Sequence, residues 1–212
     1  MNRLPTWVRQ HIVGLRVLLL FTVICGIVYP LVMTGIAQVA FHKQADGSLA
    51  SYNGRTVGSS LLCQEFVDAK GNPLPQYFQP RASAAAQAGV KNDYGCNPEY
   101  SAASNLGPTN PVLIQDIKQR QKQIEAFDHV KVSQIPPDAV TASGSGLDPG
   151  ISPQNAGIQV NRVAAARHIS PAAVRALVCQ YTEGRPLGFL GEPQVNVLLL
   201  NIALDQKFPV GH

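Results

Sequence analysis

Two serines in a glycine-rich stretch are the residues of this chain whose type and spacing come closest to chemistry. Ser143 and Ser145 lie in TASGSGLDPGISP, residues 141–153, which also holds the carboxylate of Asp148. An activated serine hydroxyl is the nucleophile of many hydrolases, and glycine-rich loops can cradle phosphate groups through backbone N–H groups. The segment could therefore be a catalytic loop or a phosphate-binding loop.

The spacing in this segment fits neither kind of site. A nucleophile elbow has glycine two residues before and two residues after the serine, and neither Ser143 nor Ser145 has this arrangement. A P-loop has a lysine directly after its last glycine, and no lysine follows these glycines. The chain also lacks the Asp-Lys-Thr-Gly-Thr phosphorylation sequence of P-type pumps. We therefore predict no catalytic residue.

A structural turn is the interpretation that the composition of the segment favours. We expect a strand that ends at residues 139–141, a tight turn at the glycines, and a change of direction at the Asp-Pro pair that follows. Ser152 then caps a helix. The alternative is a turn that also contacts a partner protein. The residues assigned to the turn or contact are Ser143, Gly144, Ser145, Gly146 and Asp148.

Histidines and cysteines show no spacing typical of a metal or redox site. The five histidines are scattered along the chain, and the four cysteines form no CxxC pair. We therefore predict no metal site, and the sequence assigns no cofactor-binding residue. Cys25 lies in an apolar run and Cys179 in an apolar helical pattern, so both are expected to be buried thiols.

An apolar run near the N-terminus determines the predicted topology of the chain. Residues 17–37 carry no charge, and 21 helical residues span a hydrocarbon core of about 30 Å. A signal peptide would have a shorter apolar region, of about 7–15 residues, and a small-x-small cleavage site. We predict a cytoplasmic N-terminus at residues 1–16, a transmembrane helix at 17–40 and an extracytoplasmic domain at 41–212.

The flanking charges give the orientation. Arg3, Arg9 and Arg16 precede the run, whereas only Lys43 and Arg55 lie close behind it, which places the N-terminus in the cytoplasm. These three arginines account for most of the formal net charge of +4. The rest of the chain is nearly neutral, so a nucleic-acid partner is not indicated.

Inside the predicted span, small and polar residues recur every four positions. Such residues let helices approach closely in lipid and can form hydrogen bonds between helices. The pattern favours a helix packed against other membrane helices, with tolerated composition as the alternative. The row consists of Thr22, Gly26, Pro30, Thr34 and Gln38.

The remaining chain predicts one α+β domain of helices packed on a small sheet. Asn110, Ser152 and Ser170 each precede a proline and an amphipathic pattern, which indicates three capped helices. The second helix is expected to expose Arg162 and Arg167. Residues 195–205 fit a last helix or a buried strand.

Five motifs in sequence order carry a resemblance to a known family. They are GIVYPLVMTGIAQ at 26–38, YFQPRASAA at 77–85, SNLGPTNP at 104–111, DAVTASGSGLDPGISPQNA at 138–156 and QVNVLLLNIALD at 194–205. Together they closely resemble KdpC, the C subunit of the Kdp potassium-transporting P-type ATPase. The resemblance covers nearly the whole chain, from about residue 16 to 205.

The resemblance implies a single-pass subunit of an ATP-driven potassium importer in the cell (inner) membrane. Its implied partners are a channel-like potassium-translocating subunit, a P-type ATPase subunit and a small membrane peptide. The C subunit is described as a catalytic chaperone that raises the ATPase subunit's affinity for ATP. Because ATP is cytoplasmic and the domain is expected outside, ATP association rests on the resemblance alone, and an indirect effect through the membrane helix is physically easier.

Three residues depart from the family pattern. Gly150 stands where the family usually has histidine, so no role of a histidine side chain at this position carries over to this chain. Cys63 and Cys96 stand where the pattern has no cysteine, in a domain expected outside the cytoplasm, and we predict a disulfide between them. Two unpaired thiols are the alternative.

Two rival functions remain at this stage. One is a membrane-anchored extracytoplasmic serine hydrolase that would use Ser143 or Ser145 with His168 or His129. The other is a passive anchor for an extracellular binding module, which the membrane row disfavours.

Overall fold

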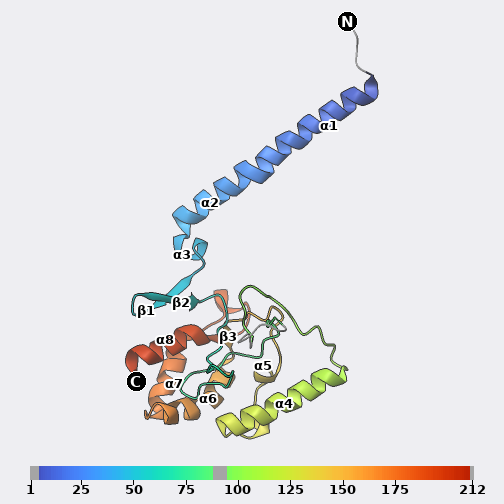
Figure 1. Cartoon of the computed structure of the whole chain (residues 1–212). Helices are drawn as coiled ribbons and strands as arrows, with labels where there is room; N and C mark the ends of the chain where they lie inside the picture. Colours follow the sequence, from blue (N-terminus) through green and yellow to red (C-terminus); the bar gives the residue numbers. More distant parts are fainter. Residues whose placement is uncertain (1–4, 88–94, 211–212) are drawn as a thin grey trace. The chain divides into compact units, whose positions relative to one another are not determined.

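The computed structural model describes residues 5–87 and 95–210, which form two compact units. The first unit runs up to Ser48 and is helical, and the second begins at Leu49 and contains helices with two small antiparallel sheets (Figure 1). The predicted α+β class with one N-terminal apolar helix is confirmed.

The first unit is dominated by one long apolar helix. It comprises α1 Thr6–Val23, the π-helical turn η1 Ile24–Val28 and α2 Tyr29–Ala40, followed by the short helix α3 His42–Ala45. Over its 35 residues the helix contains an 18-residue window with a mean hydropathy of 2.4, so it is long and apolar enough to cross a membrane. The helix begins eleven residues before the predicted start of the span at 17, because residues 6–16 continue the helical backbone.

Pro30 explains the π-helical turn inside this helix. A proline has no N–H to donate, so the carbonyl of Gly26, four residues earlier, cannot receive the usual helical hydrogen bond. The N–H of Tyr29 instead donates to the carbonyl of Ile24, five residues back. The widened turn accommodates the proline ring without ending the helix.

The second unit holds its longer helices in the C-terminal half of the chain (Figure 1). Its elements are β1 Leu49–Tyr52, β2 Arg55–Ser59, α4 Pro111–Asp128, η2 Val132–Gln134, α5 Pro137–Val140, β3 Gly150–Ile151, α6 Pro153–Ala166, α7 Pro171–Gln180, β4 Thr182–Glu183, η3 Pro186–Gly188, β5 Gln194–Asn196 and α8 Val197–Lys207.

The two sheets are short and antiparallel. β1 and β2 form a hairpin with an irregular register between Ala50 and Ser51. The other sheet has the strand order β3-β5-β4, with Ile151 and Thr182 both opposite Val195 on the central strand. α6 and α8 both contact β5, so these two helices pack on this sheet.

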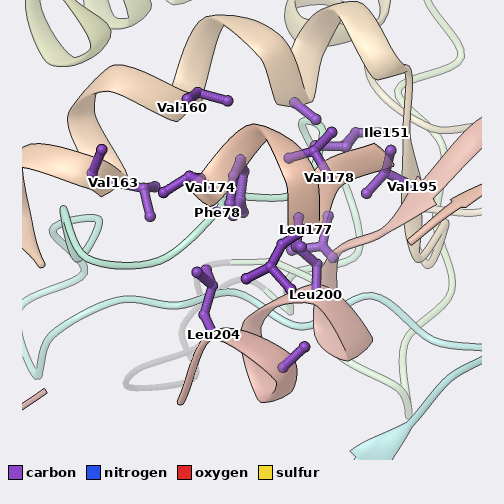
Figure 2. Packing of buried hydrophobic residues seen from close by; sticks show 14 residues of the cluster. Phe78, Ile151, Val160, Val163, Val174, Leu177, Val178, Val195, Leu200 and Leu204 are labelled. Carbon is purple, nitrogen blue, oxygen red and sulfur yellow. The ribbon is translucent and has the colours of Figure 1, made fainter. Parts of the chain in front are cut away.

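The hydrophobic core lies among α6, α7, α8 and the three-stranded sheet (Figure 2). One core residue, Phe78, comes from an irregular segment far from these elements in the sequence, and it is fully buried. Its members larger than alanine are Phe78, Ile151, Val160, Val163, Val174, Leu177, Val178, Val195, Val197, Leu200 and Leu204.

The three predicted helix starts are confirmed. The side chain of Asn110 accepts the N–H of Val112 at the start of α4. Ser152 and Ser170 accept the N–H three residues ahead at the starts of α6 and α7. In each helix, proline occupies the first helical position, where its missing N–H leaves no gap in the hydrogen bonding.

Two predicted elements differ in the structure. The strand expected at 139–141 is wrong: Pro137–Val140 forms the short helix α5, whose start is preset by two consecutive prolines. For residues 195–205 the sequence fits a helix or a buried strand, and the structure contains both, since β5 ends at Asn196 and α8 begins at Val197. The Asn196 side chain accepts the N–H of Leu199, which starts the helix directly after the strand.

Four predictions of exposure or burial are also wrong. Arg162 and Arg167 are buried rather than exposed, because their guanidinium groups bond to carboxylates and backbone carbonyls inside the domain. Cys179 is exposed rather than buried, because it lies on the face of α7 that points away from the core. Cys25 is exposed as well, on the apolar helix.

Candidate functional site

The hydroxyl of Ser143 organises the glycine-rich segment. Its Oγ accepts the N–H of Gly146 at 3.0 Å and that of Ser145 at 3.3 Å, and the residue is only 4% exposed. The N–H of Ser143 donates to the carbonyl of Ala82 at 3.1 Å. The side chain therefore acts as a backbone hydrogen-bond acceptor in a turn, which is a usual role of buried serine.

The following residues tie the turn to two other segments. The carbonyl of Ser145 accepts the hydroxyl of Ser101 at 2.9 Å and the N–H of Ala102 at 3.0 Å. The carbonyl of Gly146 accepts the hydroxyl of Ser83 at 2.7 Å. Residues 83, 101–102 and 143–146 are thus joined into one corner.

Gly146 is required at this corner by its backbone conformation and by its surroundings. Its φ is +72°, a conformation that side chains other than glycine rarely adopt. A Cβ at this position would lie 2.5 Å from the carbonyl oxygen of Ala102 and 2.6 Å from the Cβ of Ala85. At Gly144, by contrast, a Cβ would meet no described atom within 4 Å.

Asp148 contacts the backbone that follows the turn and one distant side chain. One carboxylate oxygen accepts the N–H of Gly150 at 3.0 Å, and the other pairs with Arg81 at 3.0 Å. A second carboxylate, Asp138, accepts the N–H and the hydroxyl of Ser152. Asp138 and Arg81 were not singled out by sequence reasoning, because their partners lie 14 and 67 residues away.

The two histidines considered for a hydrolase lie at the ends of helices. His129 follows α4 and His168 follows α6, with φ values of 56° and 55°. In the described part of the chain, neither histidine forms a hydrogen bond with Ser143 or Ser145. The same described residues contain no group of three or more His, Cys, Asp or Glu side chains placed to hold a metal ion.

The structure joins Cys63 and Cys96 in a disulfide, with a Cα–Cα distance of 5.4 Å. The bond lies against the corner formed by the glycine-rich segment. The Sγ of Cys63 is 3.2 Å from the carbonyl oxygen of Gly146, and the N–H of Cys96 donates to Ser83 at 3.0 Å. Two features that the sequence identifies separately, the cysteine pair and the turn, therefore lie side by side.

A groove of about 790 Å³ lies between α4 and the segment of residues 65–82. Its lining includes Asp128 and Arg162, which pair at 2.7 Å with side chains only 5% and 4% exposed. Burial raises the pKa of Asp128, and the Arg162 guanidinium opposes this rise. Burial likewise lowers the pKa of Arg162, and Asp128 opposes this fall. Because desolvation dominates for both partners, the pair fixes geometry more than it adds stability.

Arg162 and Arg167 hold the backbone of the irregular segment that leads to Phe78. Arg162 donates to the carbonyls of Pro75 and Tyr77 at 2.7 and 2.8 Å. Arg167 donates to the carbonyl of Gln76 at 2.7 Å and pairs with Asp205 at 2.7 Å. Side chains of α6 and α8 thus take the place of a neighbouring strand for this segment.

The polar side chains of the membrane row form hydrogen bonds within the first unit. The hydroxyls of Thr22 and Thr34 each donate to the carbonyl four residues back, at 2.8 Å. Gln38 donates to Asp46 at 2.9 Å, and its carbonyl oxygen lies 2.9 Å from a ring nitrogen of His42. At Gly26, a Cβ would meet no described atom within 4 Å. The glycine therefore leaves a gap on the outside of the helix.

The fold and these contacts define a class of protein: one span-length apolar helix joined to a small α+β domain whose polar side chains mainly hold its own irregular backbone. Comparison with known families identifies the family within this class. The family model described as "K+-transporting ATPase, c chain" (KdpC) matches residues 11–206, and this chain belongs to that family.

Curated relatives agree with this assignment. The potassium-transporting ATPase KdpC subunit of Sorangium cellulosum is 51% identical over 91% of this chain and 95% of its own length. That of Dechloromonas aromatica is 50% identical over 88% of this chain and 91% of its own. That of Kineococcus radiotolerans is 46% identical over 97% of this chain and 98% of its own. The similarity thus includes both the apolar helix and the domain.

Proposed function

We propose that this chain is the accessory subunit of an ATP-driven, high-affinity potassium import complex. In this proposal it is needed for assembly and raises the affinity of the ATPase subunit for ATP, and it catalyses no reaction itself. The observation that carries the proposal is the family match over residues 11–206, which includes the membrane helix as well as the domain. The role of Ser143 as a backbone acceptor supports the non-catalytic part.

The proposed partners are a channel-like potassium-translocating subunit, a P-type ATPase subunit and a small membrane peptide. The chain would cross the cell (inner) membrane once, with the N-terminus in the cytoplasm and the domain outside. With this topology the domain cannot reach cytoplasmic ATP. An effect on ATP affinity then works by linkage: contacts that favour one conformation of the complex change the affinity of a distant site.

The central experiment compares the purified complex with and without this chain. We expect the KM for ATP of the potassium-dependent ATPase to rise when the chain is absent and to fall again on its re-addition. Equilibrium dialysis of the full-length chain alone with ATP separates the two mechanisms, since no binding is expected if the effect is indirect. An unchanged KM would contradict the chaperone role.

The non-catalytic role has its own test. Ser143→Ala and Ser145→Ala should each leave the ATPase activity of the complex within a few-fold of wild type, because neither hydroxyl is proposed to touch a substrate. A fluorophosphonate should not label the chain. Specific labelling that is lost in either serine variant would favour the serine hydrolase instead.

The orientation can be tested with a natural cysteine, because Cys179 is exposed on α7. In a Cys25→Ser background, a membrane-impermeant maleimide should label the chain in spheroplasts before lysis. The Cys179→Ser variant provides the control for labelling at other sites. Labelling that requires lysis would mean that the topology is reversed.

A further inference from the structure

The N-terminal end of the apolar helix continues past the hydrocarbon core of a bilayer. The helix runs for 35 residues, Thr6–Ala40, or about 52 Å, whereas the core is about 30 Å thick. With residue 27, the middle of the uncharged run at 17–37, at the bilayer centre, Arg16 lies about 16 Å from that centre. This depth falls between the edge of the hydrocarbon core and the outer edge of the headgroups. Arg16 therefore lies at the level of the lipid phosphates.

Arg9 and Arg16 lie on the same side of α1. Their spacing of seven residues places them about 20° apart around the helix axis and about 10 Å apart along it. No aspartate or glutamate precedes Asp46 in the sequence. Over residues 5–87 and 95–210, neither arginine forms a salt bridge. An anionic partner for the two guanidinium groups therefore has to come from the surroundings of the helix.

The side of the helix that carries the arginines differs from the side that carries the membrane row. Thr22, the member of the row that is closest to Arg16 in the sequence, lies about 120° from it around the axis. Leu20 lies only about 40° from Arg16, one turn deeper in the bilayer, and is 57% exposed. The arginine side thus continues into apolar surface at the depth of the acyl chains. Helices that pack on the row near Thr22 leave this side to the lipid.

We propose that Arg9 and Arg16 bind the phosphate group of an anionic phospholipid in the cytoplasmic leaflet, with its acyl chains against Leu20. This inference rests on the proposed topology and goes beyond the transport role. The planar guanidinium group matches the oxygens of a phosphate, which it binds through two N–H donors. A soluble phosphate matches the arginines alone, whereas a lipid matches both the arginines and the apolar surface below them. In a zwitterionic lipid, the ammonium of the headgroup competes for the phosphate, so the site selects a lipid with a net negative charge.

The first experiment compares the two sides of the helix. Trp7 is the single tryptophan of the chain, so a Trp7→Phe background accepts one new reporter. Leu20→Trp places it on the arginine side, and Leu18→Trp places it about 160° from Arg16 at nearly the same depth. Both leucines are exposed, so neither substitution removes a packing contact within the chain. The full-length chain is reconstituted in vesicles of phosphatidylcholine and phosphatidylglycerol, in which one of the two lipids carries bromine atoms that quench tryptophan on contact.

The expected result is a preference for the anionic lipid on one side only. Labelled phosphatidylglycerol should quench the reporter at residue 20 in preference to labelled phosphatidylcholine. Each arginine should contribute about fivefold to the relative association of the anionic lipid. The reporter at residue 18 should show a much weaker preference, because the lipids on that side contact neither arginine.

Substitution of the arginines tests the site directly. In the Leu20→Trp chain, Arg9→Gln and Arg16→Gln should each lower the preference by about fivefold. Arg16→Lys keeps the charge and should keep most of the preference. Lys43→Gln, beyond the other end of the membrane helix, removes an equal charge and is the matched control, which should change nothing. Far-UV circular dichroism of each variant checks that the helix is intact.

The proposal is overturned if the reporters at residues 18 and 20 show the same preference, because the attraction would then be diffuse. It is also overturned if the glutamine variants keep the wild-type preference. Glycerol phosphate added at constant ionic strength should not abolish the preference, and its abolition would assign the arginines to soluble phosphate esters instead. The vesicles hold the same lipids in both leaflets and no partner subunit, so this test and the test of the proposed function can fail separately. The leaflet itself is checked by the maleimide test of the orientation.

Discussion

The side-chain amide of Asn201 binds both backbone polar groups of Phe78. Its Oδ1 accepts the N–H of Phe78 and its Nδ2 donates to the carbonyl of Phe78, both at 2.9 Å, and the two residues are 1% and 0% exposed. The side-chain amide of Asn201, on α8, thereby forms the pair of hydrogen bonds that a neighbouring β-strand would form with Phe78. This contact lets the ring of Phe78 enter the core without leaving its peptide groups unsatisfied.

Replacement of Asn201 should therefore be costly. Asn201→Leu leaves one buried donor and one buried acceptor without partners, and each such loss destabilises by about 1–3 kcal/mol. We expect the free energy of unfolding to fall by about 2–6 kcal/mol in denaturant titrations of the full-length chain in detergent. Asn161→Leu, on the exposed face of α6, is the matched control and should change it by less than about 0.5 kcal/mol. Equal effects of the two substitutions would contradict this role.

Tyr77 gives a prediction for alkaline pH. Its hydroxyl donates to Asp205 at 3.1 Å, which requires the neutral phenol. Burial raises the pKa of Tyr77, the charge of Asp205 raises it further, and Arg167 partly opposes the rise. Above the unfolded pKa of about 10, the unfolded chain therefore loses this proton before the folded chain does. Stability should be fully present below that pH and fall as the pH rises through the folded pKa.

The measurement is the melting temperature of the full-length chain as a function of pH. Tyr77→Phe should flatten the alkaline decline and, at neutral pH, cost about 1 kcal/mol for the lost hydrogen bond. Tyr100→Phe, at an exposed position, serves as the control and should keep the decline. An alkaline decline that is the same in wild type and Tyr77→Phe would mean that other groups cause it.

Local signals were predictable from the sequence, and contacts between distant segments were not. The helix starts after Asn110, Ser152 and Ser170 follow from a capping residue and a proline within a few positions. The burial of Arg162 depends on Asp128, 34 residues away, and on backbone carbonyls more than 80 residues away. Periodicity along one helix carries no information about such partners.

One further difference has another cause. Cys179 lies five positions after the buried Val174, which is about 140° around a helix of 100° per residue, so its exposure could have been deduced from the helical period.

The glycine-rich segment gives a comparison of two glycines that lie two residues apart. Gly146→Ala forces a side chain into a positive-φ position and against Ala85 and Ala102, so we expect a loss of at least about 2 kcal/mol of stability. Gly146→Val should prevent normal folding. Gly144→Ala meets no described atom and should be neutral within about 0.5 kcal/mol. Thermal unfolding checks both, and similar melting temperatures for the two alanine variants would contradict the structural role of Gly146.

The membrane helix is tested at Gly26. Gly26→Leu should leave the soluble domain folded, because a side chain there meets no described atom of this chain. It should weaken assembly, because a bulky residue blocks the close approach of a second helix in lipid. Co-purification with the partner subunits is the measurement, and Leu19→Ile, on the same helix, is a control that keeps the side-chain volume. Normal assembly of Gly26→Leu would mean that the row of small residues is only tolerated composition.

The disulfide between Cys63 and Cys96 links stability to the proposed location of the domain. The two residues are 33 positions apart and are 8% and 6% exposed, beside the corner that contains Gly146. Closing a loop of this length stabilises by about 3–5 kcal/mol in the chain-entropy model, so Cys63→Ser with Cys96→Ser should lower the melting temperature markedly.

Disulfides persist outside the reducing cytosol, so native membranes should yield a linked pair of peptides containing these cysteines under non-reducing conditions. Cys25 and Cys179 should be alkylated in the same denatured sample and so provide the internal control for free thiols. Recovery of Cys63 and Cys96 as alkylated free thiols would contradict both the bond in the cell and the extracytoplasmic location that it supports.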